Sequence, residues 1–220
     1  MTLLTLFDYC GTAVFAITGC LVAARRGVDI IGFIWLATVT AIGGGTLRDL
    51  IIGRDVFWVM QPLYLYLCLA VGVVMFFIAH WIHRHMHLIL WFDAVGLALF
   101  AVIGTQIALN AGMNIPVCIT MGIITATMGG VFRDLLAGEA TLIFRREIYV
   151  TAAVLSSVTF LGLTLGGLAE TACVAIGVTA GFTLRAMALR YRLMLPGYDW
   201  VIAVDGNAPP PPQPDRRHQR

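Results

Sequence analysis

The sequence predicts an all-α membrane protein with seven transmembrane helices, built from two inverted three-helix repeats and a seventh helix. Three observations lead to this fold class. Apolar residues make up 60% of the chain and charged residues only 12%, about half the charged share of soluble domains. Seven apolar stretches approach the ~20 residues that cross a bilayer. The sequence also repeats itself at a constant offset.

The apolar stretches follow one another with short polar links and cover most of the chain. We expect spans at residues 3–24, 30–52, 63–81, 88–109, 115–136, 148–168 and 170–189. The links are too short to hold a soluble catalytic domain, which argues against an enzyme. Segment 196–220 is rich in proline and polar residues, and we expect it to be a disordered cytoplasmic tail.

Two motifs occur twice, and the same offset separates the copies of both, with no gap between them. FDYCGTAVFAITG at Phe7 returns as FDAVGLALFAVIG at Phe92, and TAIGGGTLRDLIIG at Thr40 returns as TATMGGVFRDLLAG at Thr125. The offset is 85 residues, and we call two residues equivalent when 85 positions separate them. We therefore place the first repeat at residues 1–84, the second at 85–169 and the seventh helix at 170–195. Because each repeat holds three spans, the second copy must cross the membrane in the opposite direction.

The basic residues are unevenly distributed between the two ends of the predicted spans. All 14 are arginines, and most fall in four groups: Arg25 and Arg26; Arg84; Arg145 and Arg146; Arg185, Arg190 and Arg192. With seven spans these groups share one side, so the positive-inside rule places the N-terminus outside and the C-terminus in the cytoplasm of an inner-membrane protein. The net charge of +2 comes from this asymmetry and does not indicate a nucleic-acid partner.

Ionisable residues inside the predicted spans occur in matched sets. They are Asp8, Arg48 and Asp49 in the first copy and Asp93, Arg133 and Asp134 in the second. Charges within a bilayer are costly and are functional by default. Neighbours on a helix point in different directions, so each arginine needs an aspartate from another helix.

The duplication nominates Asp8 for Arg48 and Asp93 for Arg133. We expect two Asp–Arg clusters on opposite sides of a central cavity. The alternative is a purely structural role, as fixed ion pairs or as side chains that extend to the headgroups.

Consecutive glycines precede each Arg-Asp pair. They are Gly43, Gly44 and Gly45 in the first copy and Gly129 and Gly130 in the second. Glycines weaken a helix, so a broken or bent helix that lines a polar pathway is one interpretation. Close helix crossing is the other. Nearby hydroxyls, among them Thr46 and Thr127, could bind a dehydrated monovalent cation or bond back to their own helices.

Other patterns give weaker indications. The glycine pairs 162/166 and 177/181 have GxxxG spacing, which suits helix contacts within or between subunits. His83 and His87 are four residues apart, a spacing that binds zinc in some enzymes, but no third metal ligand accompanies them. We therefore expect this segment to be an interfacial loop. The five cysteines are scattered through the spans, and we expect neither a metal site nor a bound cofactor, although membrane lipid is an expected partner.

The segments GGGTLRDLIIG and MGGVFRDLLAG, each preceded by an FD..G...FA..G helix, resemble the prokaryotic branch of the TRIC family, the trimeric intracellular cation channels. This family is also catalogued as a duplicated glycine-transporter domain. The resemblance covers about residues 5 to 190. It implies a homotrimer of seven-helix subunits, each with a pore bent at the glycine motifs of helices two and five and permeable to K⁺ and Na⁺. One departure is Met128, where the first copy has Gly43.

Two functions from different classes stay open on these grounds. In a channel, Arg133 or Arg48 would act as a movable positive gate, since a fixed cation would repel the permeant ion. In a secondary transporter, the repeats would alternate around a central site for a small amino acid such as glycine. An arginine would then hold the carboxylate and an aspartate the ammonium.

Overall fold

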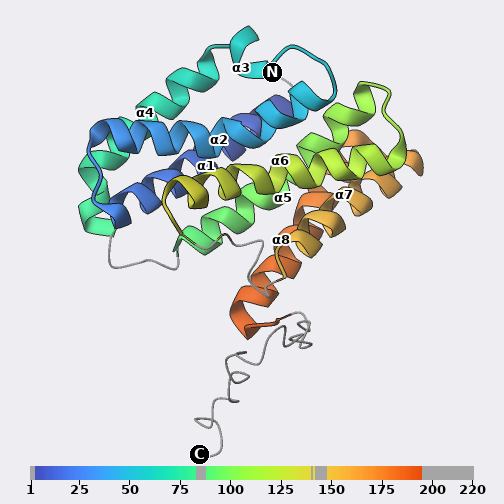
Figure 1. Ribbon diagram of the computed structural model, residues 1–220. Helices are drawn as coiled ribbons and strands as arrows, with labels where there is room; N and C mark the ends of the chain where they lie inside the picture. The colour runs from blue at the N-terminus through green and yellow to red at the C-terminus, as the bar shows by residue number, and fades with distance from the viewer. Residues whose placement is uncertain (1–2, 83–87, 140, 142–147, 195–220) are drawn as a thin grey trace, which may run out of the picture.

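The computed structural model describes residues 3–82, 88–139, 141 and 148–194 (Figure 1). The helices in this part of the chain are α1 (Leu3–Arg26), α2 (Ile30–Ile51), α3 (Phe57–Met60), α4 (Leu63–Ile82), α5 (Leu88–Asn110), α6 (Ile115–Leu136), α7 (Val150–Leu165) and α8 (Glu170–Tyr191). The tail expected at 196–220 and the histidines at 83 and 87 lie outside the described residues.

The predicted all-α membrane fold is confirmed, and the seven long helices match the seven predicted spans to within three residues at each end. Sequence reasoning missed α3, which has only four residues. Five helices, α1, α2, α5, α6 and α8, are long and apolar enough to cross a membrane. The described part of α4 and the 16-residue α7 are apolar but shorter. The count of seven transmembrane helices therefore stays a prediction.

Helices α2 and α6 end in the same way at equivalent positions. Gly53 and Gly138 occupy the same place in the two copies and adopt left-handed conformations, with φ of +72° and +63°. In each copy the amide of the next residue donates to the carbonyl of the aspartate in the Arg-Asp pair, at 3.0 Å in the first copy and 2.8 Å in the second. Glycine takes this conformation without a Cβ clash, so it fixes the helix end just after the Arg-Asp pair.

Helices α2 and α6 lie side by side and run in opposite directions (Figure 1). They touch through their backbones. A Cβ on Gly44 would overlap the carbonyl oxygen of Thr125 in α6, and a Cβ on Gly129 would overlap the carbonyl oxygen of Thr40 in α2. The two contacts are reciprocal, because Gly44 is equivalent to Gly129 and Thr40 is equivalent to Thr125.

The expectation of broken helices at the glycines is wrong. Both α2 and α6 are continuous α-helices through these residues. Gly44 and Gly129 instead allow a crossing in which no side chain fits at these two positions, which is the second interpretation of the sequence. Whether the two helices bend there stays a prediction.

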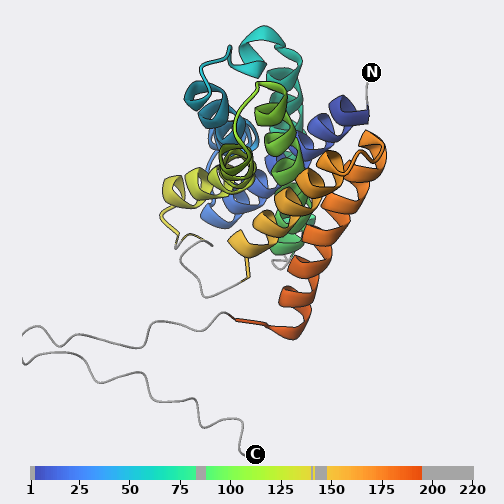
Figure 2. The same ribbon diagram turned by 90° about the vertical axis from the view of Figure 1, so that its right-hand side faces the viewer.

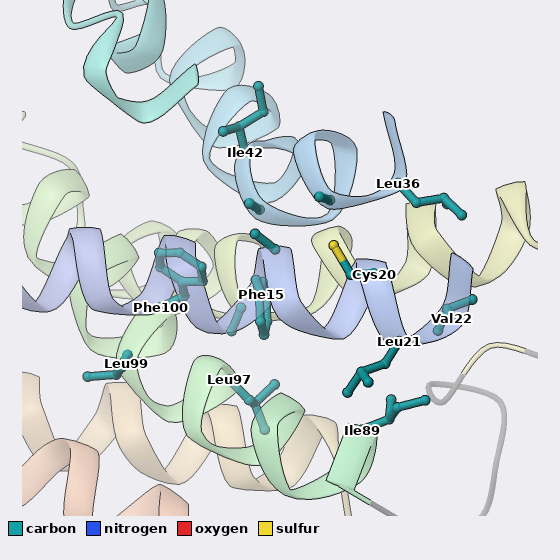
Figure 3. Packing of buried hydrophobic residues seen from close by; sticks show 14 of the residues in the cluster. Phe15, Cys20, Leu21, Val22, Leu36, Ile42, Ile89, Leu97, Leu99 and Phe100 are labelled. Carbon is teal, nitrogen blue, oxygen red and sulfur yellow. The ribbon is translucent and has the colours of Figure 1, made fainter. Parts of the chain in front are cut away.

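The core lies where α1 packs against α5. The rings of Phe15 and Phe100, which are equivalent residues, meet edge to face with centroids 5.0 Å apart. A Cβ on Gly11 would press on the Phe100 ring, and a Cβ on Gly96 would overlap the Phe15 ring. Figure 3 shows α1 between the apolar side chains of α2, such as Ile42, and those of α5.

The remaining helices pack on this centre from two sides (Figure 2). Helix α4 contacts α1 and α2, whereas α7 contacts α5 and α6, and α8 covers α5 and α7. In α8 the GxxxG pair serves this internal packing: Ser156 Oγ of α7 donates to the carbonyl of Gly177 at 3.0 Å, and a Cβ on Gly181 would overlap Ser156. By contrast, a Cβ on Gly162 would meet no atom within 4 Å.

The crossing makes a testable prediction about glycine substitutions. Gly44→Ala and Gly129→Ala each drive a methyl group into a backbone carbonyl, so we expect each to lower the melting temperature of the purified protein by at least about 3 °C. Gly162→Ala is the matched control, because its methyl group meets no neighbouring atom of the same subunit within 4 Å and alanine favours the helix. Equal melting temperatures for all three variants would contradict the direct backbone contact between α2 and α6.

Candidate functional site

The first cluster gathers near the C-terminal end of α2. Tyr64 Oη of α4 donates a hydrogen bond to Asp8 Oδ2 of α1 at 2.5 Å. Arg48 donates to Asp49 Oδ1 from Nε and from Nη2, both at 2.8 Å. Asp49 Oδ2 accepts from the amide of Phe57 at 3.0 Å. Asp8 therefore accepts from a tyrosine hydroxyl, whereas Asp49 accepts from Arg48 and from a backbone amide.

A cavity of about 450 Å³ borders this cluster. Its walls combine charged, polar and apolar side chains: Thr5, Asp8, Arg48, Arg54, Asp55, Phe57, Met60, Gln61, Tyr64, Ile103 and Ile107. Arg54, Asp55 and Gln61 are exposed or partly exposed, so the cavity opens toward the outside of the molecule. An ion that enters it meets Asp8 and Arg48 on its wall.

The second cluster is enclosed between α1, α5 and α6. Arg133 Nη1 donates to Asp93 Oδ1 at 3.0 Å and to Thr18 Oγ1 at 3.1 Å. Arg133 Nε donates to Asp134 Oδ1 at 2.9 Å. The side chains of Arg133 and Asp93 are 1% and 0% exposed. This guanidinium is thus held by groups from three helices and is sealed from solvent.

Tyr149 and Arg185 complete the surroundings of the second cluster. The hydroxyl of Tyr149 lies beside the Asp93 carboxylate without reaching hydrogen-bond geometry. The guanidinium of Arg185 in α8 stacks over the Tyr149 ring, 5.1 Å from its centroid, and donates to the carbonyl of Ile148 at 3.2 Å. Helix α8, which lies outside the duplicated part, therefore reaches the second cluster through one aromatic ring.

The predicted partners are half right. The Asp93–Arg133 ion pair is confirmed, but the structure has no ion pair between the equally well described Asp8 and Arg48. The expectation that adjacent Arg and Asp residues do not pair is wrong in both copies. The physical reason is the length of arginine: Cβ directions diverge at i and i+1, but a long flexible stem returns its guanidinium to the neighbouring carboxylate. Asp8 meanwhile is satisfied by Tyr64.

The two clusters lie on opposite sides of the helix crossing. Each arginine is six residues beyond the centre of the crossing, which lies midway between Thr40 and Gly44 in α2. At 1.5 Å per residue this is ~9 Å, and because the helices are antiparallel the arginines lie ~18 Å apart along the pair. The cavity described above borders the first cluster. The central cavity that we expected between the two clusters stays a prediction.

The threonine hydroxyls near the glycines bond to their own helices. Thr46 donates to the carbonyl of Ile42 at 2.7 Å, and Thr127 donates to that of Ile123 at 2.8 Å. Thr46 also accepts from Trp58 Nε1 at 2.9 Å. A hydroxyl that donates still has lone pairs, so a role as cation ligands stays a prediction.

Sequence reasoning missed several residues of the site. Tyr64 and Tyr149 are equivalent residues, and a search for repeated tyrosines would have found them. Thr18 gave no such signal, because its counterpart is Ile103. No three His, Cys, Asp or Glu side chains of the described residues converge in the way that metal ligands do.

Comparison with known proteins gives consistent results. The sequence profile of the family described as "Glycine transporter" matches residues 5–80 and 90–164. The UPF0126 membrane protein of Vibrio cholerae is 36% identical over 202 residues, which cover 90% of this chain and 83% of that protein. The UPF0126 inner membrane protein YadS of Escherichia coli K12 is 36% identical over 207 residues, which cover 91% of this chain and 96% of YadS.

Solved structures agree in fold over nearly the whole chain. The TRIC trimeric intracellular cation channel orthologue from Rhodobacter sphaeroides superposes with a TM-score of 0.85 at 46% identity, covering 88% of this chain and 100% of the orthologue. A structure from work on conductance through TRIC cation channels superposes with a TM-score of 0.82 at 28% identity, covering 90% and 98%. A prokaryotic TRIC channel in 0.5 M KCl gives 0.81 at 29% identity, covering 86% and 96%.

The different partners of the two aspartates predict unequal effects of the same substitution. Asp93→Asn removes a charge from a buried ion pair, which costs about 3–5 kcal/mol, so we expect a clear drop in melting temperature. Asp8→Asn should lower it by no more than about 2 °C, because the Tyr64 hydroxyl can donate to the amide oxygen instead. Thermal unfolding of the two purified variants decides between this expectation and equal effects.

Proposed function

We infer the function from the family: this chain belongs to the TRIC cation channels, whose sequences the Glycine transporter profile also describes. It is accordingly a multi-pass inner-membrane channel protein and not an enzyme. We propose that it forms a homotrimer in which each subunit has its own pore for K⁺ and Na⁺. The trimeric assembly named for the Rhodobacter sphaeroides orthologue supports the first part of this proposal.

We propose that the pore follows α2 and α6 and passes both charged clusters. The observation that carries this proposal is the placement of two matched Asp–Arg clusters on either side of one helix crossing. The two copies would be inverted in the membrane. The reciprocal contacts of Gly44 and Gly129, and the contact of Phe15 with Phe100, support this inversion, because two-fold related units meet in reciprocal contacts.

The charges of the first cluster favour cations. With its groups ionised, it holds two carboxylates and one guanidinium, and therefore a formal charge of −1. The second cluster holds the same three groups, but the neighbouring Arg185 offsets their excess. In a site of low dielectric constant the excess of the first cluster attracts a cation and repels an anion. The net negative charge of the first cluster supports entry of K⁺ beside Arg48.

The orientation of the pathway follows from the positive-inside rule. With the N-terminus outside, the first cluster and its cavity lie on the outer side, and the sealed second cluster lies on the cytoplasmic side. A cation would enter from outside as far as Arg48. It would pass to the cytoplasm only when Arg133 moves away from Asp93, so Arg133 serves as a gate that Asp93 holds.

Transport of a small amino acid such as glycine is the second candidate. The description of the matching family favours it, and so does a cavity in which Arg48 and Asp8 could receive a carboxylate and an ammonium group. A transporter would bind its substrate saturably and exchange it across the membrane. A channel would instead give currents larger than any transporter turnover.

Planar-bilayer recording with a K⁺ gradient tests the proposal. We expect the purified protein to give discrete openings whose current reverses near the K⁺ equilibrium potential. Replacing K⁺ by Na⁺ should preserve the openings, whereas N-methylglucamine should abolish the cation current. Silent bilayers together with saturable glycine uptake and counterflow in proteoliposomes would establish the transporter instead.

The oligomeric state makes a separate prediction. Light scattering of the protein in detergent or nanodiscs should give a protein mass about three times the 23.9 kDa of one chain. The mass should stay constant when the protein is diluted tenfold, because an obligate membrane oligomer does not dissociate readily. A mass of one chain in both environments would contradict the homotrimer.

A further inference from the structure

The duplication lets the two clusters be compared position by position, and the residues that contact the two arginines differ at two positions. Phe57, which faces Arg48, has Leu142 as its counterpart in the sequence. Thr18 contacts the second arginine, and Ile103 occupies the equivalent position in the other copy, beside the first arginine. The aspartates, the arginine and the tyrosine are the same in both copies. The different states of the two clusters therefore need an explanation outside these shared residues.

Thr18 is well suited to hold a guanidinium. Its hydroxyl donates to the carbonyl of Phe15 at 2.8 Å, which turns its lone pairs away from the backbone of α1. It then accepts from Arg133 Nη1 at 3.1 Å, and its side chain is fully buried. An N–H of a buried guanidinium that lost this acceptor would be left unsatisfied, which is costly.

The first cluster lacks such a contact. Ile103 reaches the cavity beside Arg48 but has no side-chain atom that accepts a hydrogen bond. Arg48 is held by Asp49 of its own helix and faces the Phe57 ring, with its Cζ 5.8 Å from the centroid. No described hydrogen bond links Arg48 to α1 or α5. Arg48 is nearly as buried as Arg133, at 3% against 1% side-chain exposure, so the two arginines differ in their bonds and in the cavity beside Arg48 rather than in burial.

A second departure from the repeat lies at the same end of the molecule as Arg133. Arg25 pairs with Glu139 at 2.9 Å, which ties the end of α1 to the end of α6. The equivalent positions in the other half are Asn110 and Arg54, which cannot form an ion pair. Both departures thus add bonds between α1 and α6 and none between their counterparts, α5 and α2.

We propose that Thr18 is a positioning residue that holds Arg133 across the pathway and thereby makes the Arg133 side the closed gate, whereas Ile103 leaves Arg48 without a hydrogen bond to the helices across the cavity. This inference rests on the proposed pathway along α2 and α6. The hydroxyl group of Thr18 is a difference between the two sides that lies directly on the second arginine. The Arg25–Glu139 ion pair reinforces the same closure.

Arginine modification tests the positioning role without any ion current. Purified protein is treated with 2,3-butanedione in borate, and peptide mass spectrometry follows the modification of Arg48 and Arg133 in the same sample. In the wild-type protein Arg48 should react faster. Thr18→Val keeps the volume but removes the hydroxyl, and we expect it to raise the rate at Arg133 about tenfold with no change at Arg48.

Two matched variants separate the hydrogen bond from packing. Thr18→Ser keeps the hydroxyl and should leave the rate at Arg133 as in the wild-type protein. Ile103→Thr installs the hydroxyl in the other copy and should slow the reaction of Arg48 alone. The proposal is overturned if Thr18→Val leaves Arg133 unreactive, if Thr18→Ser behaves as Thr18→Val does, or if Ile103→Thr fails to protect Arg48.

Bilayer recording of the same variants tests the gate. Thr18→Val should raise the open probability several-fold, and Thr18→Ser should restore the wild-type value. If Arg133 becomes reactive while the open probability is unchanged, the gate lies elsewhere and that part of the inference is wrong. If the bilayers are silent for every variant while the modification rates shift as expected, the channel proposal fails and the positioning role of Thr18 stands.

Discussion

Direct contact between the backbones of α2 and α6 constrains the rest of the molecule. At Gly44 and Gly129 the neighbouring carbonyl lies where a Cβ would be, so the crossing has a single register and no side chain can occupy it. The two helices continue beyond the crossing in opposite directions, and each carries its Arg-Asp pair to a different side. Helices α1 and α5 cross beside α2 and α6. Helix α1 places Asp8 near the C-terminal end of α2, and helix α5 places Asp93 near the C-terminal end of α6.

The protein solves one electrostatic problem in two ways. A buried carboxylate needs donors, because its desolvation is otherwise not compensated. Asp93 obtains a charged donor from Arg133, whereas Asp8 obtains a neutral one from Tyr64. Arg48 has no described hydrogen bond to another helix, and a cavity borders it. Similar sequences thus give one sealed, charge-paired site and one site that borders an open cavity in the same chain.

Much of the fold could be predicted from the sequence, because apolar stretches separated by glycine and polar links mark the helix ends directly. The Asp93–Arg133 pair could also be predicted, since duplication restricts the choice of partners. The Asp8–Arg48 pair does not form, because Asp8 takes its hydrogen bond from Tyr64, and the spacing of residues does not reveal which donor a carboxylate takes. The role of the glycines could not be predicted, because consecutive glycines are expected both at a close helix crossing and at a break in a helix. Only the positions of the neighbouring carbonyl groups distinguish the two.

The contact between Phe15 and Phe100 has an evolutionary consequence. Each ring meets the ring at its own equivalent position, as residues near a two-fold axis do. In a single-copy ancestor with the same contact, one phenylalanine would have met itself across an antiparallel dimer, and every substitution would have changed both halves at once. After two copies had fused into one chain, a substitution could change one half without the other. Thr18 and Ile103 record such a change, since a homodimer could not have acquired a hydroxyl on one side of the membrane only.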